Sequence, residues 1–503
     1  MNRQSFQDLV KGVYGRKIAY TNVERITDEN VVRVVGECIG TFYWNKPVIN
    51  YLWNYKKGDQ PAFYRTKTIR DDIVNRVVEN RAWEIVRFKN GQTYGEPIQF
   101  VSLKKDDRIN KAVDQLNDYF RAAEKAKKDL ISGEWTSAVG TGFKAVQFKN
   151  GEVPFRIVTP TPLNTFIIYS KYTEEALLAV QELTSPDGYT YKLCYSDTHE
   201  YRIQNSVLIG VQNAYGEYVT SKVHGFGGIP IIEYPNNQDR ISDIELVISM
   251  LDALNELASD RVDSVDQFVQ SFFKFVNCEI DPNLFEEMKK KGAIAVSSNN
   301  GGEGKADVDI LTQELNQTQT QVFKDDMWDS VLSIEAIPNL HNNNTGGDSQ
   351  GAIQLRNGWD QAKQATKMKD PFVVSGDNKL AELVINVINR KKGNGTLPLS
   401  IMDFEAQVSH SPQDNMQVKA QVLQMLLSCG VHPLIAIKTC GLWADAEKTF
   451  LISKDYLDVI YKTIDQIEDA QEQEQKAKDL MAQYEQQQKD MQKVNNLQQD
   501  NRV

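Results

Sequence analysis

A long apolar stripe is the feature that most constrains how this chain folds. The stripe recurs every three or four positions between residues 242 and 276, at Val247, Leu251, Leu254, Ala258, Val262, Val265, Phe268, Phe272 and Val276. That period predicts one amphipathic helix, about 50 Å long at about 1.5 Å per residue. Ser242 and Glu245 have the spacing of a capping box, in which each side chain satisfies a free backbone N–H of the first turn. One face of the predicted helix is therefore apolar.

The opposite face of the same predicted helix carries acids. These are Glu245, Asp252, Glu256, Asp260 and Asp263. One interpretation is an ordinary solvated helix face. The other is a wall that repels phosphate groups, and the periodicity alone does not choose between the two.

The composition indicates a globular protein of more than one domain. The chain has 503 residues, of which 41% are hydrophobic and 25% charged, enough to bury sizeable cores. Its formal net charge is −11. Surfaces that bind nucleic acid tightly are usually basic, so the balance argues against such binding while allowing passing contact with DNA.

Cysteine usage and hydropathy indicate an intracellular, soluble protein. The chain has five cysteines, an odd number, and its first residues lack the apolar core of a signal peptide. We therefore expect reduced thiols in a cytoplasmic compartment. No apolar run reaches the roughly 18 residues that a membrane-spanning helix needs.

The rest of the chain divides into helical and β-prone blocks. Residues 106–139 read as one helix, with Ile109, Val113, Leu116 and Phe120 on one stripe, and short β-prone runs between 143 and 233 predict an antiparallel sheet. The remaining expectations are a helix at 316–335, a helix from about 350 to 389 interrupted near Pro371 and Ser375–Gly376, a strand within LSIMDFEAQVSH, helices from about 413, and a solvated Gln-rich tail beyond Ile467.

Two segments near the long helices are rich in glycine and asparagine. Residues 277–315 contain EEMKKK and two short strand candidates, AIAVSS and VDILT, on either side of a glycine-containing loop. Residues 341–352, HNNNTGGDSQGA, lie between helical stretches. Glycine is permissive and asparagine hydrogen-bonds its own backbone, so this second segment is predicted to be a loop.

Three motifs resemble known sites, and each has a better structural explanation. VGTGFKA (139–145) matches a dinucleotide-binding pattern, but a helix precedes it and a strand follows, the reverse of what that site requires. NGGEGKA (300–306) lacks the first glycine and the hydroxyl of a phosphate loop, so a surface hairpin loop is expected. Cys429, His432 and Cys440 lack a fourth zinc ligand and are expected to be buried thiols and a helix-start histidine. The sequence thus predicts no catalytic residue, no metal and no cofactor.

Several stretches, taken in order, resemble the portal proteins of tailed double-stranded-DNA bacteriophages, especially the siphovirus-like group. The most telling is GGIPIIEYPNNQDRISDIELVISMLDALNELASDRVDSVDQF, with support from YLWNYKKGDQPAFYR, IVNRVVENRAWEIVRFKNG, GEPIQF, SGEWTSAVGTGFKAV and IPNLHNNNTGGDSQGAIQL. This chain departs from the family's pattern at Ser349-Gln350-Gly351-Ala352, which has one residue more than the usual Ser-Gly start of the following helix.

The resemblance implies an α+β portal-type subunit that assembles into a ring. It implies a mixed α/β wing, two long stem helices, a small α/β clip and an α-helical crown. The corresponding ranges are 1–240 (N-terminal region and wing), 241–276 (first stem helix), 277–315 (clip), 316–337 (second stem helix), 338–352 (tunnel loop), 353–411 (long broken helix and wing strand) and 412–503 (helical crown and C-terminal tail).

The same resemblance implies a function and its sites. The protein would form a channel, commonly a dodecamer, at one capsid vertex of the virion, after assembly in the host cytoplasm. Double-stranded DNA would pass without sequence specificity, and the partners would be the terminase large subunit, a head–tail adaptor, and the major capsid and scaffold proteins, with no membrane. The implied sites are a tunnel loop (His341, Asn342, Asn343, Asn344, Thr345, Gly346, Gly347, Asp348, Ser349), an acidic channel face (Asp252, Glu256, Asp260, Asp263) and a clip docking surface (Lys289, Lys290, Lys291, Asn299, Asn300). The alternatives are another structural capsid or scaffold component, or a phage DNA-processing enzyme such as a nuclease or ATPase.

Overall fold

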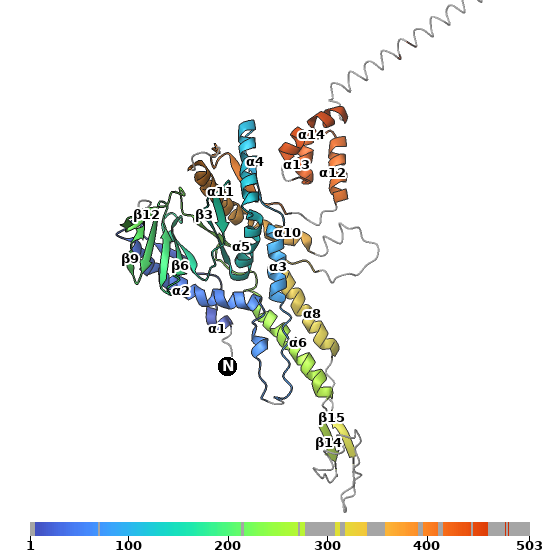
Figure 1. Cartoon of the computed structure of the whole chain (residues 1–503). Helices are drawn as coiled ribbons and strands as arrows, with labels where there is room; N and C mark the ends of the chain where they lie inside the picture. The colour runs from blue at the N-terminus through green and yellow to red at the C-terminus, as the bar shows by residue number, and fades with distance from the viewer. Residues whose placement is uncertain are drawn as a thin grey trace, which may run out of the picture. The chain divides into compact units, whose positions relative to one another are not determined.

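A computed structural model of the 503-residue chain forms two compact units, residues 1–410 and 411–503 (Figure 1). The structure describes residues 6–68, 71–212, 216–269, 272–276, 307–311, 317–339, 358–390, 396–410, 416–443 and 446–460, together with Lys478 and Met481.

The β-prone block between 143 and 233 forms two larger sheets and one small two-stranded sheet. A three-stranded sheet has β3 (Thr141–Phe148) between β4 (Phe155–Val158) and β13 (Ile231–Pro235), all antiparallel. The predicted antiparallel pairing is confirmed for most of the block. The second sheet differs from the prediction at its edge, where a strand from the N-terminal region, β1 (Ala19–Thr21), pairs parallel to β5 (Thr165–Ser170).

The second sheet has seven strands, in the order β1-β5-β6-β7-β8-β12 with β9 paired to β8. Its further strands are β6 (Ala176–Thr184), β7 (Thr190–Tyr195), β8 (His199–Gln204), β9 (Val207–Ile209) and β12 (Ser221–Val223). Helix α2 (Val31–Lys56) covers it: Val34, Val35 and Phe42 share one core with Ile168, Leu178 and Val180 of the sheet. Smaller pairs join β10 (Val211–Gln212) to β11 (Tyr218–Val219) and β2 (Gln99–Ser102) to β16 (Phe404–Gln407). The predicted strand within LSIMDFEAQVSH is β16.

The helix expected over 106–139 is two helices, α4 (Asp107–Ala122) and α5 (Lys125–Val139). Glu124 between them has φ +55°, the left-handed region that ends a helix. The apolar stripe explains α4, because Val113, Leu116 and Phe120 are buried in the core. The stripe stops there, and α5 instead buries polar side chains such as Lys125, Asp129 and Thr136.

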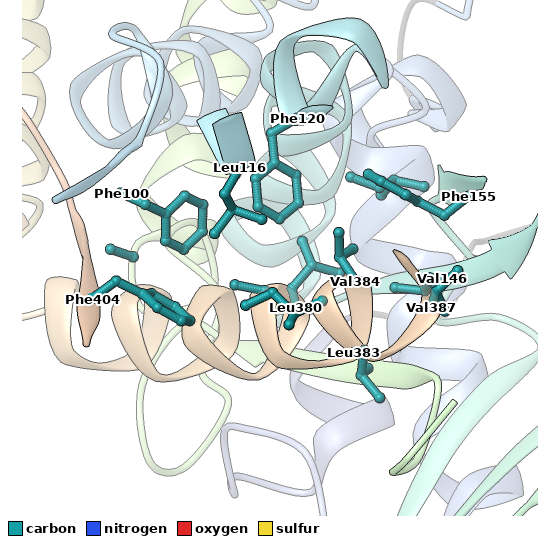
Figure 2. Packing of buried hydrophobic residues seen from close by; sticks show 14 of the residues in the cluster. Phe100, Leu116, Phe120, Val146, Phe155, Leu380, Leu383, Val384, Val387 and Phe404 are labelled. Carbon is teal, nitrogen blue, oxygen red and sulfur yellow. The ribbon is translucent and has the colours of Figure 1, made fainter. Parts of the chain in front are cut away.

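Helix α11 (Asp370–Arg390) runs through the centre of the largest core. Leu380, Val384 and Val387 of α11 point toward the aromatic rings of Phe100, Phe120, Phe155 and Phe404, as Figure 2 shows. The predicted break near Pro371 is confirmed, since α10 (Trp359–Lys367) ends and α11 begins there. The predicted break at Ser375–Gly376 is wrong. Gly376 lies within α11, and a Cβ at that position would come 2.4 Å from a ring carbon of Tyr234, so the glycine permits close packing.

The long stripe forms a shorter helix than predicted, α6 (Ile248–Val269). Phe272 and Val276 lie instead in strand β14 (Phe272–Val276), which pairs antiparallel with β15 (Asp307–Leu311). The aromatic and β-branched composition of FFKFV favours a strand once a partner strand is present. The predicted helix start at Ser242 is wrong, since residues 243–247 form a turn and α6 begins at Ile248. The reciprocal contacts are present within that turn: Ser242 N–H donates to Glu245 Oε2 (3.0 Å), and Ile244 N–H donates to Ser242 Oγ (3.1 Å).

Helix α8 (Gln317–Ile334) returns beside α6, and the two make an antiparallel hairpin, called the α6–α8 hairpin below. Arg261 Nη1 donates to Gln321 Oε1 (2.9 Å) near the start of α8. Near its end, Val331 and Leu332 share a core with Leu251 and Leu254. Strands β14 and β15 follow and precede the two helices along the chain, so they lie at the far end of the hairpin (Figure 1).

The second unit is helical in its described part, as predicted. Its helices are α12 (Met416–Ser428), α13 (Pro433–Cys440) and α14 (Ala446–Ile460). The Gln-rich tail lies outside the described residues apart from Lys478 and Met481. The remaining helices, in the first unit, are α1 (Phe6–Val10), α3 (Arg81–Tyr94) and the short 3-10 helix η1 (Pro61–Tyr64).

Two lysines and two aspartates are buried together at the centre of the first unit, and we call them the charge quartet: Lys125, Asp129, Lys144 and Asp377. None of the four is more than 3% exposed. Lys125 Nζ lies 2.6 Å from Asp129 and 2.5 Å from Asp377, and Lys144 Nζ lies 2.7 Å from Asp377 and also contacts Asp129. The quartet joins α5, β3 and α11, and Tyr234 Oη of β13 donates to Asp377 Oδ1 (2.9 Å).

Removing one charge of the quartet should destabilise the first unit strongly. Burial alone would raise the pKa of Asp377, but Lys125 and Lys144 outweigh it and hold the pKa at about 2. Asp377→Ala leaves two lysines buried with one carboxylate, and we expect a loss of about 3–5 kcal/mol in the free energy of unfolding. Urea denaturation followed by circular dichroism measures this loss.

Glu37→Ala is the matched control, because the Arg33–Glu37 pair has side chains 59% and 53% exposed. Its loss should be at most about 1 kcal/mol. Equal losses in the two variants would mean that the quartet does not hold the unit together.

Candidate functional site

The polar face of α6 binds a segment of the same chain, residues 60–68 and 71–79, which we call the bracing segment. Asn255 and Ser259 on α6 accept from its backbone, since Glu79 N–H donates to Asn255 Oδ1 (2.9 Å) and Val77 N–H donates to Ser259 Oγ (3.0 Å). Asn255 Nδ2 also donates to Gln60 Oε1 (2.5 Å). Both side chains are buried, so this face of α6 is a contact surface and is not solvated.

The carboxylates of α6 extend the same contact. Asp263 accepts from the backbone N–H of Asn75 (2.6 Å) and pairs with Lys67 (2.5 Å) and Arg65 (3.2 Å). Burial would raise the pKa of Asp263, but hydrogen bonds from Lys67 and Asn75 outweigh it and lower the pKa. Asp260 pairs with Arg65 at 2.5 Å, and Asp252 accepts from Tyr55 Oη at 2.8 Å.

The expected acidic row on this helix is therefore only partly exposed. Asp263 is 3% exposed, and Asp252 and Asp260 are half-buried; Glu256 alone of the four is exposed. Glu245 lies ahead of the helix and is buried, with Arg16 as its ion-pair partner. The prediction that these acids form an exposed row is therefore wrong for Asp263 and Glu245, because both side chains are buried. Local patterns along the chain could not indicate this burial, because the basic partners Arg16, Arg65 and Lys67 lie almost 200 residues or more away along the chain.

Helix α8 carries exposed acids that the sequence reasoning missed. Asp325, Asp326 and Asp329 are exposed, and Asp325 and Asp329 are one turn apart on the same face. Asp325 accepts from Gln321 and Asp329 from Asn339, both at 2.7 Å. The α6–α8 hairpin therefore presents Glu256 from one helix and three aspartates from the other. The spacing Asp-Asp-x-x-Asp in residues 325–329 is the sequence pattern that could have indicated this acidic face.

Large apolar side chains are also exposed on the hairpin. Val262 and Val265 of α6 are 40% and 56% exposed, and Val322, Phe323 and Ile334 of α8 are 54%, 56% and 49% exposed. Exposed apolar side chains of this size on one hairpin are typical of a protein–protein contact surface.

The tunnel-loop residues (His341 to Ser349) and the clip residues (Lys289, Lys290, Lys291, Asn299, Asn300) lie outside the described residues, as does the motif at 300–306. Their roles stay predictions. The motif at 139–145 is confirmed as a helix-to-strand turn, with Gly140 at φ +88° between α5 and β3.

Cys429, His432 and Cys440 lie on or beside helices α12 and α13 of the second unit. His432 caps α13 by accepting from Leu434 N–H at 3.2 Å, as predicted. Cys440 is buried as predicted, but Cys429 is exposed, because it lies at the exposed end of α12. Among the described residues no group of three or more His, Cys, Asp or Glu side chains is placed to hold a metal ion. None of the described helices is both long and apolar enough to cross a membrane.

Comparison with known proteins identifies the family. The family "Phage portal protein, SPP1 Gp6-like" matches residues 43–409, which include both helices of the hairpin. The chain belongs to this portal family. The predicted resemblance is confirmed, and because the family is one of structural phage proteins, the alternative of a nuclease or ATPase is not supported.

Individual relatives are distant. The portal protein of Bacillus phage SPP1 is 23% identical over 307 residues, which is 56% of this chain and 58% of that protein. The match thus spans less than two thirds of that relative's length. Similar solved structures are the neck of an empty gene transfer agent (GTA) particle computed with C6 symmetry and the neck of a native GTA particle computed with C12 symmetry. Each is 11% identical, with TM-scores of 0.41 and 0.43, covering 74% and 72% of this chain and 89% of the other.

Asp263→Ala should release the bracing segment, because it removes the acceptor for Asn75 N–H and the carboxylate nearest to Lys67, while Arg65 keeps its pair with Asp260. The expected cost is about 1.5–3 kcal/mol of local stability, typical of a charged hydrogen bond. Faster hydrogen exchange of the amides of residues 73–79 measures the loss. The pKa of Asp263 is lower in the folded chain than its ordinary value. The stabilisation by ionised Asp263 is therefore present when the pH is above that ordinary pKa, and it is lost as the pH falls through the pKa of the folded chain.

Glu256→Ala, on the exposed side of the same helix, is the control and should leave these amides unchanged. Equal protection in the two variants would show that Asp263 does not hold the segment.

Proposed function

We propose that this chain is the subunit of a phage portal ring, a channel at one capsid vertex through which double-stranded DNA is packaged and ejected. The observation that carries the proposal is the α6–α8 hairpin with β14 and β15 at its far end, inside the region that matches the portal family. A two-helix hairpin that leaves valines, a phenylalanine and an isoleucine exposed is stabilised by neighbours that cover them.

The asymmetry of the hairpin supports a head-to-tail assembly. One side of α6 is covered by the bracing segment of the same chain, and α8 presents acids and apolar groups on another. A contact between two unlike surfaces repeats head to tail, and it generates a closed ring when the rotation closes. We propose a dodecamer with the hairpins side by side around the axis.

The exposed acids suit a channel that DNA must not adhere to. Glu256, Asp325, Asp326 and Asp329 would repel phosphates within a Debye length, about 8–10 Å. The net charge of −11 of the whole chain also disfavours adhesion of DNA phosphates. DNA of any sequence would pass, because no base is read.

The other parts are assigned by their order along the chain. Residues 1–240 would be the wing, 277–315 the clip that docks the terminase large subunit and later a head–tail adaptor, and 412–503 the crown. The hairpin would be the stem, 338–352 a tunnel loop, and 353–411 the long broken helix and a wing strand. Contacts with the major capsid and scaffold proteins would hold the ring in the virion after assembly in the host cytoplasm.

Reversing the exposed charges should make the channel adhesive. Replacing Glu256, Asp325, Asp326 and Asp329 by lysine should raise DNA retention in the ring and make it steeply salt-dependent. The slope of log K against log salt should change by about 0.9 for each new phosphate contact. Filter binding over a salt series measures the slope.

The control carries the same charge change on exposed acids of the wing: Glu24, Glu29, Glu174 and Asp187 to lysine. If both quadruple variants gain DNA affinity equally, the hairpin acids do not face the channel.

DNA content of assembled particles tests the function itself. Particles assembled without the protein should contain no DNA, and particles with the wild-type protein should be filled. Rings with residues 342–347 shortened should assemble and bind terminase normally, yet package or retain less DNA. Filled particles in the absence of the protein would end the portal proposal, and full packaging by the shortened loop would make that segment only a connector.

A further inference from the structure

Four charged side chains meet where α8 ends: Lys89, Asp243, Glu335 and Lys369. They come from α3, the turn before α6, the residue after α8 and the turn before α11. Asp243 is well satisfied, since its carboxylate accepts from Lys369 Nζ (2.7 and 2.8 Å), Ser137 Oγ (2.6 Å) and Asn236 Nδ2 (2.9 Å). This cluster fixes the base of the hairpin to the body of the first unit.

Helix α8 ends there in a Schellman motif. Ile337 N–H donates to Leu332 O (2.8 Å) and Ala336 N–H to Ser333 O (3.2 Å). Ala336 occupies the left-handed position at φ +50°, where glycine is usual, so the turn carries strain. Lys89 Nζ donates to the backbone carbonyl of Glu335, which places a cation at the negative end of the helix.

The Glu335 carboxylate is held more weakly than that of Asp243. Its side chain is 6% exposed, and among the described residues its ion-pair partner is Lys89 Nζ at 3.5 Å. The other charged groups that act on it are Asp243, which repels it, and Lys369, which attracts it. Two lysines and two carboxylates balance when Glu335 is ionised, and the cluster carries one net positive charge when Glu335 is protonated.

A small cavity beside the cluster gives room for water. It has a volume of about 20 Å³, and Lys89, Lys369, Ser137, Asn236 and Asn90 are among the residues that line it. Such a volume accepts one water molecule. Asn90 Oδ1 is buried without a protein donor and offers that water an acceptor.

We propose that this cluster is a proton-controlled junction, in which protonation of Glu335 fastens the end of α8 and its ionisation loosens it. Neutral Glu335 fits the buried site without a strong partner, while Lys89 keeps its contact with the helix-terminal carbonyl. Ionised Glu335 must be accommodated beside the Asp243 carboxylate, with Lys89 Nζ at 3.5 Å as its ion-pair partner and Lys369 engaged by Asp243. The proposal concerns regulation of the hairpin and does not depend on the ring.

The direction of the pH dependence follows from Glu335. Burial, with a further contribution from Asp243, raises its pKa to about 7, from an ordinary value of 4.5. The native junction therefore holds the proton more tightly than an opened one. The resulting stabilisation of the closed junction is complete below about pH 4.5 and is lost as the pH rises through about 7.

Hydrogen exchange of the amides of residues 334–338 in the full chain tests the proposal. After correction for the intrinsic exchange rates of the amides, opening should be about tenfold more frequent at pH 8 than at pH 6. This follows from a pKa of Glu335 of 4.5 in the opened junction and about 7 in the closed one. Glu335→Gln should abolish this dependence and stay protected at both pH values. Glu84→Gln, on the exposed face of α3, should behave as wild type.

Two further variants keep the test decisive. Ala336→Gly should slow exchange at every pH by relieving the left-handed strain and should keep the tenfold dependence. His410, whose ring lies 2.8 Å from Asp370 at the start of α11, also has a raised pKa, owing first to that hydrogen bond. If His410→Gln removes the dependence, or if wild type shows none, the junction at Glu335 is refuted.

Discussion

The charge quartet at the centre of the first unit is the interaction on which the rest of the structure depends. Lys125, Asp129, Lys144 and Asp377 are buried together, and a buried charge is tolerated only when its partners are in place. The quartet therefore fixes α5, β3 and α11 relative to one another. Tyr234 extends the arrangement to β13, with Gly376 of α11 packed against its ring.

The α6–α8 hairpin starts directly from this framework. Two residues beyond Tyr234, Asn236 donates to Asp243, and Ser137 of α5 donates to the same carboxylate. Asp243 leads into α6, and Lys369 links it to the start of α11. The hairpin is thus anchored by polar contacts at its base and braced along α6 by the bracing segment. Its exposed apolar side chains remain available for contacts outside the subunit, in keeping with the proposed ring.

Regular periodicity predicted the elements that a single apolar stripe explains. The buried face of α4 follows from apolar residues that recur every three or four positions. The strands between residues 143 and 233 follow from short β-prone runs bounded by turn residues. The family itself was recognisable from short stretches in the correct order. These predictions needed only neighbouring residues in the chain.

The rest depended on contacts between distant residues. The end of α6 could not be placed because FFKFV continues the helical stripe, and its strand partner, β15, lies more than 30 residues later. The division between α4 and α5 was hidden because α5 buries charges whose partners are on β3 and α11. Gly376 looked like a helix break, whereas its role is to admit the ring of Tyr234. The acids of α6 looked solvent-exposed because Arg65 and Lys67 come from a segment with no regular pattern.

The most direct test of the account is the symmetry of the purified protein imaged by electron microscopy along its axis. We expect a closed ring of about a dozen copies, with the α6–α8 hairpins side by side around a central hole and their exposed valines and Phe323 covered by neighbours. A monomer, or a closed dimer with the hairpins exposed to solvent, would contradict it.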